Sequence, residues 1–375
     1  MEIHSKYSSQ SLKRYGLGML LLLGSVAIGF AQKLPSPTRV WSVGPLTKSA
    51  PVMGIAFGAG GATTTGPHVD TQTGSIFAAT RSVVFAGDRI VLASKMGMRR
   101  VEGAQNPAEV YQLLSLDVRS GEVKDSRELF AFGSLEVFAT NDAHVIIAGH
   151  SVMRLTPDLK DAGSFDYDAR GHKFGRVQNV SPDGSTLGNA TSPGFELVDA
   201  QTLKVTPLTA SPAVDTSVNA KGFVTDNVHW IRDYPKDRAF ITYTDAAGEH
   251  LLYHGKCGGR PQFLSDNLVL EPGCKSPLII DTHGSLVRIL SVKGEFSYAG
   301  VSQNGTRFAL QVASFSATHS VTHEHFVVYS VDTGEPVAEV APDEPGEEQS
   351  WTAFSPDGSM IVVGSPLKLT LYRLP

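Results

Sequence analysis

The chain has 375 residues and a formal net charge of −5 at pH 7, because its 37 Asp and Glu outnumber its 32 Lys and Arg. This mildly acidic balance, without a basic stripe interleaved with aromatic residues, argues against a general nucleic-acid-binding protein. A composition rich in Gly, Val, Ser and Thr, without runs of charge, favours a soluble all-β domain.

The first 31 residues have the three parts of a secretory signal peptide. Lys13 and Arg14 close a basic start, residues 17–30 are apolar, and Ala31 supplies the small residue of a cleavage site. The apolar run of about 14 residues is short of the roughly 20 that a spanning helix needs, which disfavours a retained anchor. We therefore expect export, removal of residues 1–31, and one domain over residues 32–375 in the periplasm or outside the cell, with no stable membrane insertion.

Two further segments precede the repeats. Residues 39–46 begin with the alternating sequence Arg39-Val40-Trp41-Ser42-Val43, which predicts one strand. Residues 50–79 are rich in Gly and Thr and predict a flexible surface connection. The Gly-rich run at 58–66 lacks the third Gly of a dinucleotide fingerprint and the Lys of a phosphate-binding loop, so we expect no cofactor.

From residue 85 onwards the chain repeats one short pattern: an apolar residue, two spacers, an Asp or Asn, and a turn-prone or polar residue. The clearest copies are Val180-Ser181-Pro182-Asp183-Gly184 and Phe354-Ser355-Pro356-Asp357-Gly358. The Asp or Asn positions are 88, 141, 183, 226, 266, 304 and 357, with spacings from 38 to 53 residues. A period of about 40 residues built from strands is typical of propeller blades.

Each repeat contains the signals of four short strands. A second turn recurs between the third and fourth strands, beginning at Asp117, Asp199, Asp281 and Asp332. Four antiparallel strands in each of seven units predict an all-β, seven-bladed β-propeller.

The last repeat lacks its outermost strand. Residues 359–364 and 368–374 supply two strands after the turn, and the chain then ends at Pro375. We expect the strand in residues 39–46 to complete the last blade and close the ring, which removes two free sheet edges. An eight-bladed ring is the alternative, and it would need residues 52–79 to form a degenerate blade.

At this point the chain resembles exported seven-bladed propellers of the WD-repeat-like and YVTN-like kind. The Ser-Pro-Asp-Gly turns at 181–184 and 355–358, and the Asp turns that end third strands, carry the resemblance. It covers nearly all of residues 32–375 as a repeat pattern, but the chain has no Trp-Asp dipeptide. It implies the fold and carries no particular activity.

The two cysteines, Cys257 and Cys274, are expected to form a disulfide. An even count in an exported chain favours a bridge over free thiols. The two residues lie symmetrically about the predicted turn at Ser265-Asp266, so a hairpin places them opposite one another, or offset by one residue if the turn carries a bulge.

Propeller geometry separates two faces of the ring. Turns joining strands one to two and three to four lie on one face, here called the turn face. Connections joining strands two to three, and blade to blade, lie on the other, here called the loop face. The irregular insertions all fall on the loop face, at 96–109, 150–151, 191–194, 233–237, 274–277 and 314–324. Variable loops on a rigid frame are where binding usually resides.

The loop-face insertions carry a surplus of basic and imidazole side chains. The candidate ligand-binding residues are Arg99, Arg100, His150, Arg232, Lys236, Lys275, His319 and His323. Their positive balance suggests an anionic ligand or an acidic partner surface. An ordinary solvated loop surface would carry the same scatter of charge.

One histidine cluster has the spacing of metal ligands. His323 and His325 would share one face of a strand, and His319 could join them through the loop. Glu324 would point away, so no carboxylate supports the imidazoles, and we expect a solvated hairpin with no metal.

The sequence therefore predicts an exported binding or scaffold propeller that holds a protein, peptide or glycan on its loop face. The alternative is a propeller-type enzyme, such as a quinone-dependent dehydrogenase or a sugar lyase, with an axial active site. No convergent acid–base pair is evident in the sequence, and no catalytic residue is assigned.

Overall fold

A computed structural model of the chain describes residues 34–44, 47–48, 52–53, 69–70, 74–75, 80–99, 107–131, 134–149, 151–172, 175–209, 216–226, 239–255, 257–315, 321–342, 350–365 and 368–375. Residues from Leu34 to Pro375 form one compact unit. The regular secondary structure of the described part is β-strand, apart from one short 3₁₀ turn, η2 (Asp168–Arg170). Within the described ranges, no helix is long and apolar enough to cross a membrane.

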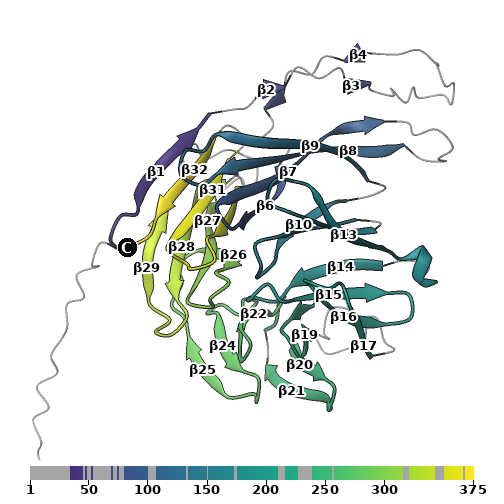
Figure 1. Cartoon of the computed structure of the whole chain (residues 1–375). Coiled ribbons are helices and arrows are strands. Elements are labelled where there is room, and N and C mark those ends of the chain that lie inside the picture. Colours follow the sequence, from purple (N-terminus) through teal and green to yellow (C-terminus); the bar gives the residue numbers. More distant parts are fainter. Residues whose placement is uncertain are drawn as a thin grey trace, which may run out of the picture. The chain divides into compact units, whose positions relative to one another are not determined.

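The strands form seven four-stranded antiparallel sheets, the blades of a β-propeller, numbered I to VII in chain order (Figure 1). The first strands of blades I to VII are β6 (Thr80–Ala86), β10 (Glu136–Ala139), β14 (Gly175–Val180), β18 (Ser217–Val218), β22 (Gln262–Ser265), β26 (Glu295–Val301) and β30 (Trp351–Phe354). The second strands are β7 (Arg89–Arg99), β11 (Val145–Ala148), β15 (Thr186–Thr191), β19 (Gly222–Asp226), β23 (Leu268–Glu271), β27 (Arg307–Phe315) and β31 (Met360–Gly364).

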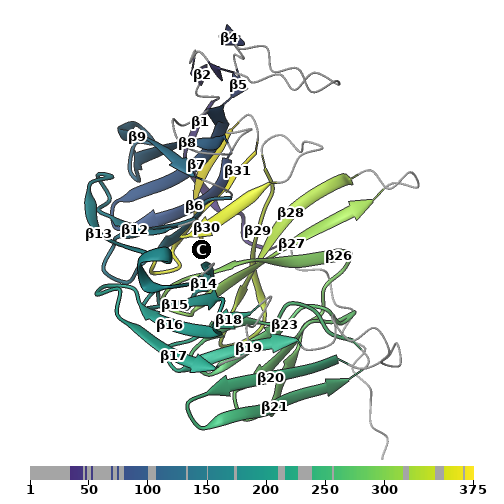
Figure 2. The ribbon, with the colours of Figure 1, turned by 90° about the vertical axis from the view of Figure 1, so that its right-hand side faces the viewer.

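The third and fourth strands complete each blade; the four strands of blade IV, for example, lie side by side in Figure 2. The third strands are β8 (Ala108–Asp117), β12 (Ser151–Leu155), β16 (Phe195–Asp199), β20 (Ala239–Asp245), β24 (Leu278–Asp281), β28 (Val321–Ser330) and β32 (Leu369–Arg373). The outer, fourth strands are β9 (Val123–Ala131), β13 (Asp161–Asp166), β17 (Val205–Thr209), β21 (Gly248–Gly255), β25 (Leu286–Ile289), β29 (Pro336–Val340) and β1 (Thr38–Val43). The predicted seven-bladed propeller is confirmed.

The hydrophobic core lies between the blades. Seven clusters of buried apolar side chains occur, and each is shared by two adjacent blades, including blades VII and I. Each sheet therefore buries both faces, which explains why β11, β15 and β19 are buried along their whole length instead of alternating.

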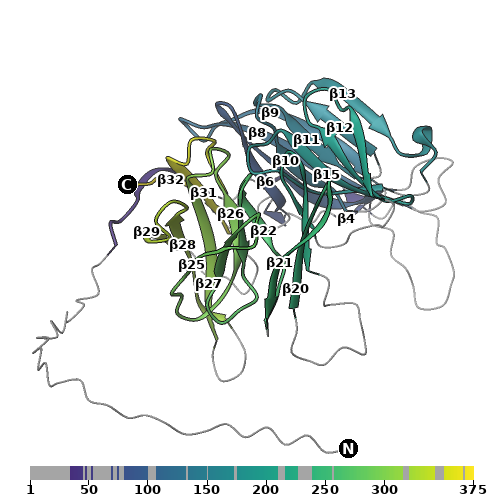
Figure 3. The same cartoon turned by 90° about the horizontal axis from the view of Figure 1, so that it is seen from below.

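The N-terminal strand closes the ring. β1 pairs antiparallel with β32, so blade VII has the order β1-β32-β31-β30, and the two strands run side by side in Figures 1 and 3. Trp41 donates its indole N–H to the carbonyl oxygen of Val118 in blade I at 2.7 Å. Gly121 of blade I has φ +74°, and a Cβ there would lie 2.8 Å from Val43 Cγ2. β1 is thus held by its own blade and by the next one.

The described residues of the segment before blade I form no four-stranded eighth blade. They form two ladders of two residues each, β2 (Thr47–Lys48) with β5 (Gly74–Ser75) and β3 (Val52–Met53) with β4 (Val69–Asp70). Most of residues 50–79 lies outside the described residues, so the expected flexible connection stays a prediction.

The Asp turns have the structural role expected of them. In blade III, Asp183 Oδ1 accepts hydrogen bonds from the Ser181 hydroxyl at 2.5 Å and the Ser185 amide at 3.1 Å. In the second turn of that blade, Asp199 accepts several hydrogen bonds that lower the pKa of its carboxyl. The bond from the Thr202 amide makes the largest contribution. The carboxylates of Asp183 and Asp199 thus accept hydrogen bonds from groups of their own turns.

Turn-face contacts also connect blades. The amide of Asn141 in blade II donates to the Gly184 carbonyl in blade III at 3.1 Å, and Asn304 Nδ2 in blade VI donates to the Asp357 carbonyl in blade VII at 2.7 Å. Gln303 of blade VI reaches the Thr140 carbonyl of blade II at 3.3 Å, which ties two non-adjacent blades together.

The predicted turn of blade IV is wrong. Residues 222–226 are the second strand, β19, and the turn lies earlier in the chain. There Asn219 Oδ1 accepts from the amides of Lys221 at 2.9 Å and Gly222 at 2.8 Å. The side chain of Asn219 thus makes the turn that the sequence pattern assigned to Asp226.

The disulfide between Cys257 and Cys274 is confirmed, with 4.9 Å between the two Cα atoms. β22 and β23 pair with a register shift between Phe263 and Ser265, which corresponds to the bulged version of the predicted hairpin. The bridge lies beyond the paired residues and holds together the two chain segments that leave the hairpin. Closing a loop of this length contributes about 3 kcal/mol.

Loss of the closing strand should destabilise the whole ring. Deletion of residues 32–46 exposes the edge of β32, and Trp41→Ala removes a blade VII–blade I contact at a cost of about 3 kcal/mol. Urea unfolding measures both effects. Val40→Ala is the matched control, because Val40 is 38% exposed on the same strand and should cost little. A truncated chain that unfolds at the urea midpoint of residues 32–375 would show that the ring does not depend on β1.

Candidate functional site

The structure separates the two predicted binding residues that it fully describes. Arg99 ends β7 in blade I, where its Nη1 lies 3.2 Å from Glu128 Oε1 and its guanidinium carbon lies 5.0 Å from the Phe130 ring centroid. Lys275 is exposed between β23 and β24 in blade V. The two blades are not adjacent, so these two cations do not form one cluster.

The remaining predicted binding residues cannot be placed as side chains. Arg100, His150, Arg232, Lys236 and His319 lie outside the described residues. His323 lies on β28 opposite Ser314, and its side chain is also outside the described part. The predicted basic surface on the loop face therefore stays a prediction.

Two predicted insertions are shorter than expected because the strands continue into them. Arg99 pairs with Ala108 in blade I, and Phe315 pairs with Val321 in blade VI. The segments predicted as loops at 96–109 and 314–324 thus begin and end as paired strands. As expected, these two longest insertions belong to the first and sixth blades.

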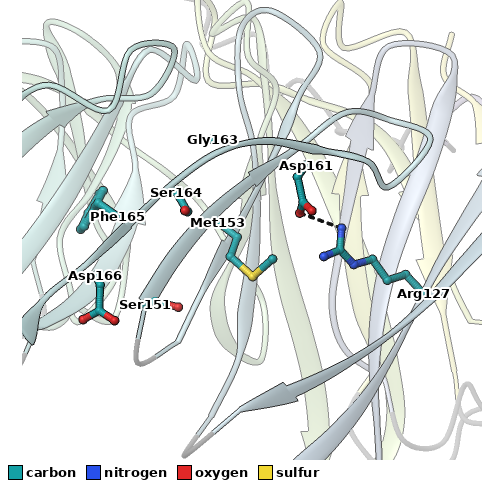
Figure 4. A pocket seen from close by; sticks show the side chains of 8 residues that line it. All are labelled: Arg127, Ser151, Met153, Asp161, Gly163, Ser164, Phe165 and Asp166. Carbon is teal, nitrogen blue, oxygen red and sulfur yellow. Dashed lines mark hydrogen bonds and ion pairs between the residues drawn. The ribbon is translucent and has the colours of Figure 1, made fainter. Parts of the chain in front are cut away.

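A groove with a volume of about 480 Å³ runs along the outer strand of blade II (Figure 4). Its lining residues are Arg127 from β9, Ser151 and Met153 from β12, and Asp161, Gly163, Ser164, Phe165 and Asp166 from β13. The paired residues Ser151 and Asp166 mark its loop-face end, because β12 begins and β13 ends on that face. The loop-face end of the groove therefore includes Ser151, which follows predicted binding position 150 in the chain.

The groove combines one apolar side chain with polar ones, because Met153 faces blade I whereas Phe165 packs on the opposite face of the sheet, towards blade III. Met153 and Phe165 are partly buried, and the Ser164 side chain is exposed. Arg127 Nη1 donates to Asp161 Oδ1 and to the Leu159 carbonyl, both at 2.9 Å, so this guanidinium links blade I to blade II. Phe165 is fixed edge-on against Tyr167, at 5.4 Å between ring centroids. Such a lining offers hydrophobic contact together with hydroxyl and carboxylate hydrogen-bonding groups.

A buried polar network, which was not predicted from the sequence, lies between blades II and III at the loop face. Glu196 is 5% exposed and accepts hydrogen bonds from Arg170 Nη2 at 3.1 Å and Asn189 Nδ2 at 2.9 Å. Asn189 Oδ1 accepts from the Tyr167 hydroxyl at 2.6 Å, and burial raises the pKa of that phenol. The one feature of the sequence that indicates this network is a Glu within the otherwise apolar residues 195–198. The network fixes the chain segment that follows the groove.

A second buried carboxyl lies at the loop-face end of blade V. Glu271 is fully buried, and its Oε1 accepts a hydrogen bond from the Gly273 amide at 2.7 Å. Among the described residues, its Oε2 has no hydrogen-bond partner. Burial, with a smaller contribution from the charge of Asp226, raises the pKa of Glu271 to about 7. This carboxyl therefore titrates near neutral pH.

Two imidazoles of the histidine cluster, those of His319 and His323, lie outside the described side chains. Among the described residues, no group of three His, Cys, Asp or Glu could hold a metal ion. Glu324 points into the protein and binds Gln311 and the Ser350 hydroxyl. His325 Nε2 lies 3.8 Å from Glu339 Oε1.

The chain matches no known family model and no curated protein. Among solved structures it is similar to a chain in the crystal structure of the mitotic checkpoint complex, with a TM-score of 0.49 and 13% identity over 80% of this chain and 91% of that one. It is also similar to the WD40 β-propeller domain of Doa1, with a TM-score of 0.46 and 11% identity over 78% of this chain and 92% of that one. The assignment as a seven-bladed β-propeller rests on the strand pairing of the described blades and not on these two likenesses.

The raised pKa of Glu271 predicts a specific pH dependence of stability. The folded state holds this proton more tightly than the unfolded state, whose carboxyl has a pKa near 4.5. The contribution of Glu271 is therefore fully present below pH 4.5 and lost as the pH rises through 7, a change of about 3 kcal/mol. Urea unfolding of Glu271→Gln between pH 4.5 and 8.5 should show a gain over the native chain that grows with pH.

Glu249→Gln is the matched control, since Glu249 is exposed on β21 of the neighbouring blade. This variant should follow the native pH profile. The same profile in Glu271→Gln would show that Glu271 is ionised in the folded protein throughout this range.

Proposed function

We propose that the protein is an exported binding module that holds an extended segment of a protein or peptide partner. The groove beside β13 is the observation that supports the proposal. It is open along its length, the apolar side chain of Met153 faces it on the blade I side of the sheet, and it begins at the loop face. Its length along a whole strand suits an extended chain better than a compact small molecule.

The frame around the groove is already organised before any partner binds. Arg127 and Asp161 join the two blades that border it, and the Glu196 network fixes the chain that leaves β13. A partner therefore need not order the site, which lowers the entropic cost of association.

A steric block in the groove should abolish partner binding. Ser164 is exposed in the groove, so Ser164→Trp fills it without disturbing the buried core. Thr206→Trp is the matched control, because Thr206 is exposed on the outer strand of blade III. Protein from the native source would be cross-linked, and partner peptides cross-linked near residues 151–166 would be identified by mass spectrometry and remade as synthetic probes.

We expect such a probe to bind the native protein and Thr206→Trp equally, and to bind Ser164→Trp at least tenfold more weakly. Equal binding to all three proteins would place the partner elsewhere, and cross-links confined to other blades would reject the groove as the site.

Export is a separate part of the proposal. It is supported by the basic start and apolar run of residues 1–31 and by the disulfide, because such bridges persist in oxidising compartments. The full chain expressed in a bacterium should be recovered in the periplasm or medium with Gln32 as its first residue, as measured by intact mass. Full-length protein retained in the cytoplasm would contradict export.

A further inference from the structure

The outer strand of blade V differs from those of the other blades in its exposed side chains. β25 is the last strand of the order β22-β23-β24-β25, so no described strand pairs with its outer edge. Leu286, Val287 and Ile289 are 56%, 43% and 63% exposed. An apolar strand edge of this kind can accept a further strand from another chain.

The six other outer strands carry a charged residue or a proline that discourages such pairing. The exposed residues with this role are Lys124 on β9, Asp161 on β13, Pro207 on β17, Glu249 on β21, Glu339 on β29 and Arg39 on β1. A bulge does not distinguish β25, because all seven outer strands have a register shift against the third strand. Among the described strands, only β25 combines an edge without a described partner strand with three exposed aliphatic side chains.

The one charged residue of β25, Arg288, is directed towards blade VI and not along the outer edge of the strand. Arg288 pairs with Ile279, whose side chain faces blade VI, and its Nη2 donates to the Asp332 carbonyl of that blade. Leu286 pairs with Ile280, and Ile289 pairs with Leu278, on the face directed to blade IV. The strand therefore presents an aliphatic face towards blade IV and a cationic face towards blade VI.

We propose that β25 is a second interaction surface, at which an extended segment of a partner protein adds to blade V as a fifth strand. The two faces define the chemistry of that segment: aliphatic residues packing on Leu286 and Ile289, alternating with polar or acidic residues on the side of Arg288. The surface lies on a different blade from the groove and does not depend on it.

The small contact area favours a flexible segment over a second copy of the chain. Two rigid rings meeting at a four-residue edge strand would bury far less than the roughly 1,600 Å² of a standard stable interface. A flexible extended segment can instead follow the strand and contact the flanking blades, while its backbone takes up the free hydrogen-bonding groups of β25.

The test uses residues 32–375 and a fluorescein-labelled peptide, Ser-Val-Glu-Val-Thr-Val-Ser, followed by fluorescence anisotropy. A peptide with proline in place of the central valine is the ligand control, because proline cannot donate to the strand ladder. The double variant Leu286→Lys with Ile289→Lys gives β25 the charge that other outer strands carry. Leu251→Lys is the matched control, since Leu251 is 57% exposed on β21 and pairs with Thr242 on the far side of blade IV from β25.

We expect the native protein and Leu251→Lys to bind the alternating peptide equally, and the double variant to bind at least tenfold more weakly with an unchanged melting temperature. The proline peptide should bind none of them. No binding to the native protein, or equal binding by the double variant, would overturn the proposal. A native dimer in sedimentation that the double variant dissociates would also overturn it, because a second copy would then be the occupant.

Discussion

The pairing of β1 with β32 is the contact on which the rest of the molecule depends. Each blade buries both faces of its sheet, so every blade needs two neighbours. Blades VII and I obtain their shared core only when the N-terminal strand meets the C-terminal one. Trp41 contributes to that core and also hydrogen-bonds blade I. The chain must therefore bring together residues more than 300 positions apart before the ring is complete. The loss of chain entropy in this long-range contact is offset only when the interface between blades VII and I forms.

The closed ring explains why the two faces differ. On the turn face, Asp and Asn side chains are bonded within their own turns, and turn backbones of neighbouring blades bond to each other. On the loop face, the ends of the second and third strands carry buried carboxyls such as Glu196 and Glu271. The polar side chains of the turn face therefore stabilise the turns and the contacts between blades. The loop face places polar groups under variable loops, which is the arrangement expected of a rigid frame that presents binding segments.

Most of the fold could be predicted from the sequence because its signals are local and repeated. The turn at Asp183, the alternating strand at residues 39–43 and the symmetric placement of Cys257 and Cys274 about their hairpin each constrain the pairing directly. The turn of blade IV was predicted at Asp226 and lies at Asn219 instead, because both residues have turn chemistry and only the pairing of Val218 with Phe223 decides between them. The short repeat pattern does not contain the strand pairing that distinguishes the two turn positions.

The candidate sites were less predictable, because they arise from contacts between blades. The groove needs Arg127 from one blade and β13 from the next, which the repeat spacing does not bring together. The unusual edge of β25 becomes apparent only when all seven outer strands are compared. Basic residues such as Lys236 are predicted from residue type alone, whereas the sequence does not show that Glu271 is buried, and burial sets its pKa.

Hydrogen–deuterium exchange of residues 32–375, resolved to peptides that cover residues 38–43 and 369–373, tests the closure of the ring most directly. If β1 is an integral strand of blade VII, its amides bonded to β32 should exchange as slowly as those of the inner strands, through opening of the whole ring. Exchange of the β1 amides within seconds, while the other six blades remain protected, would contradict this account.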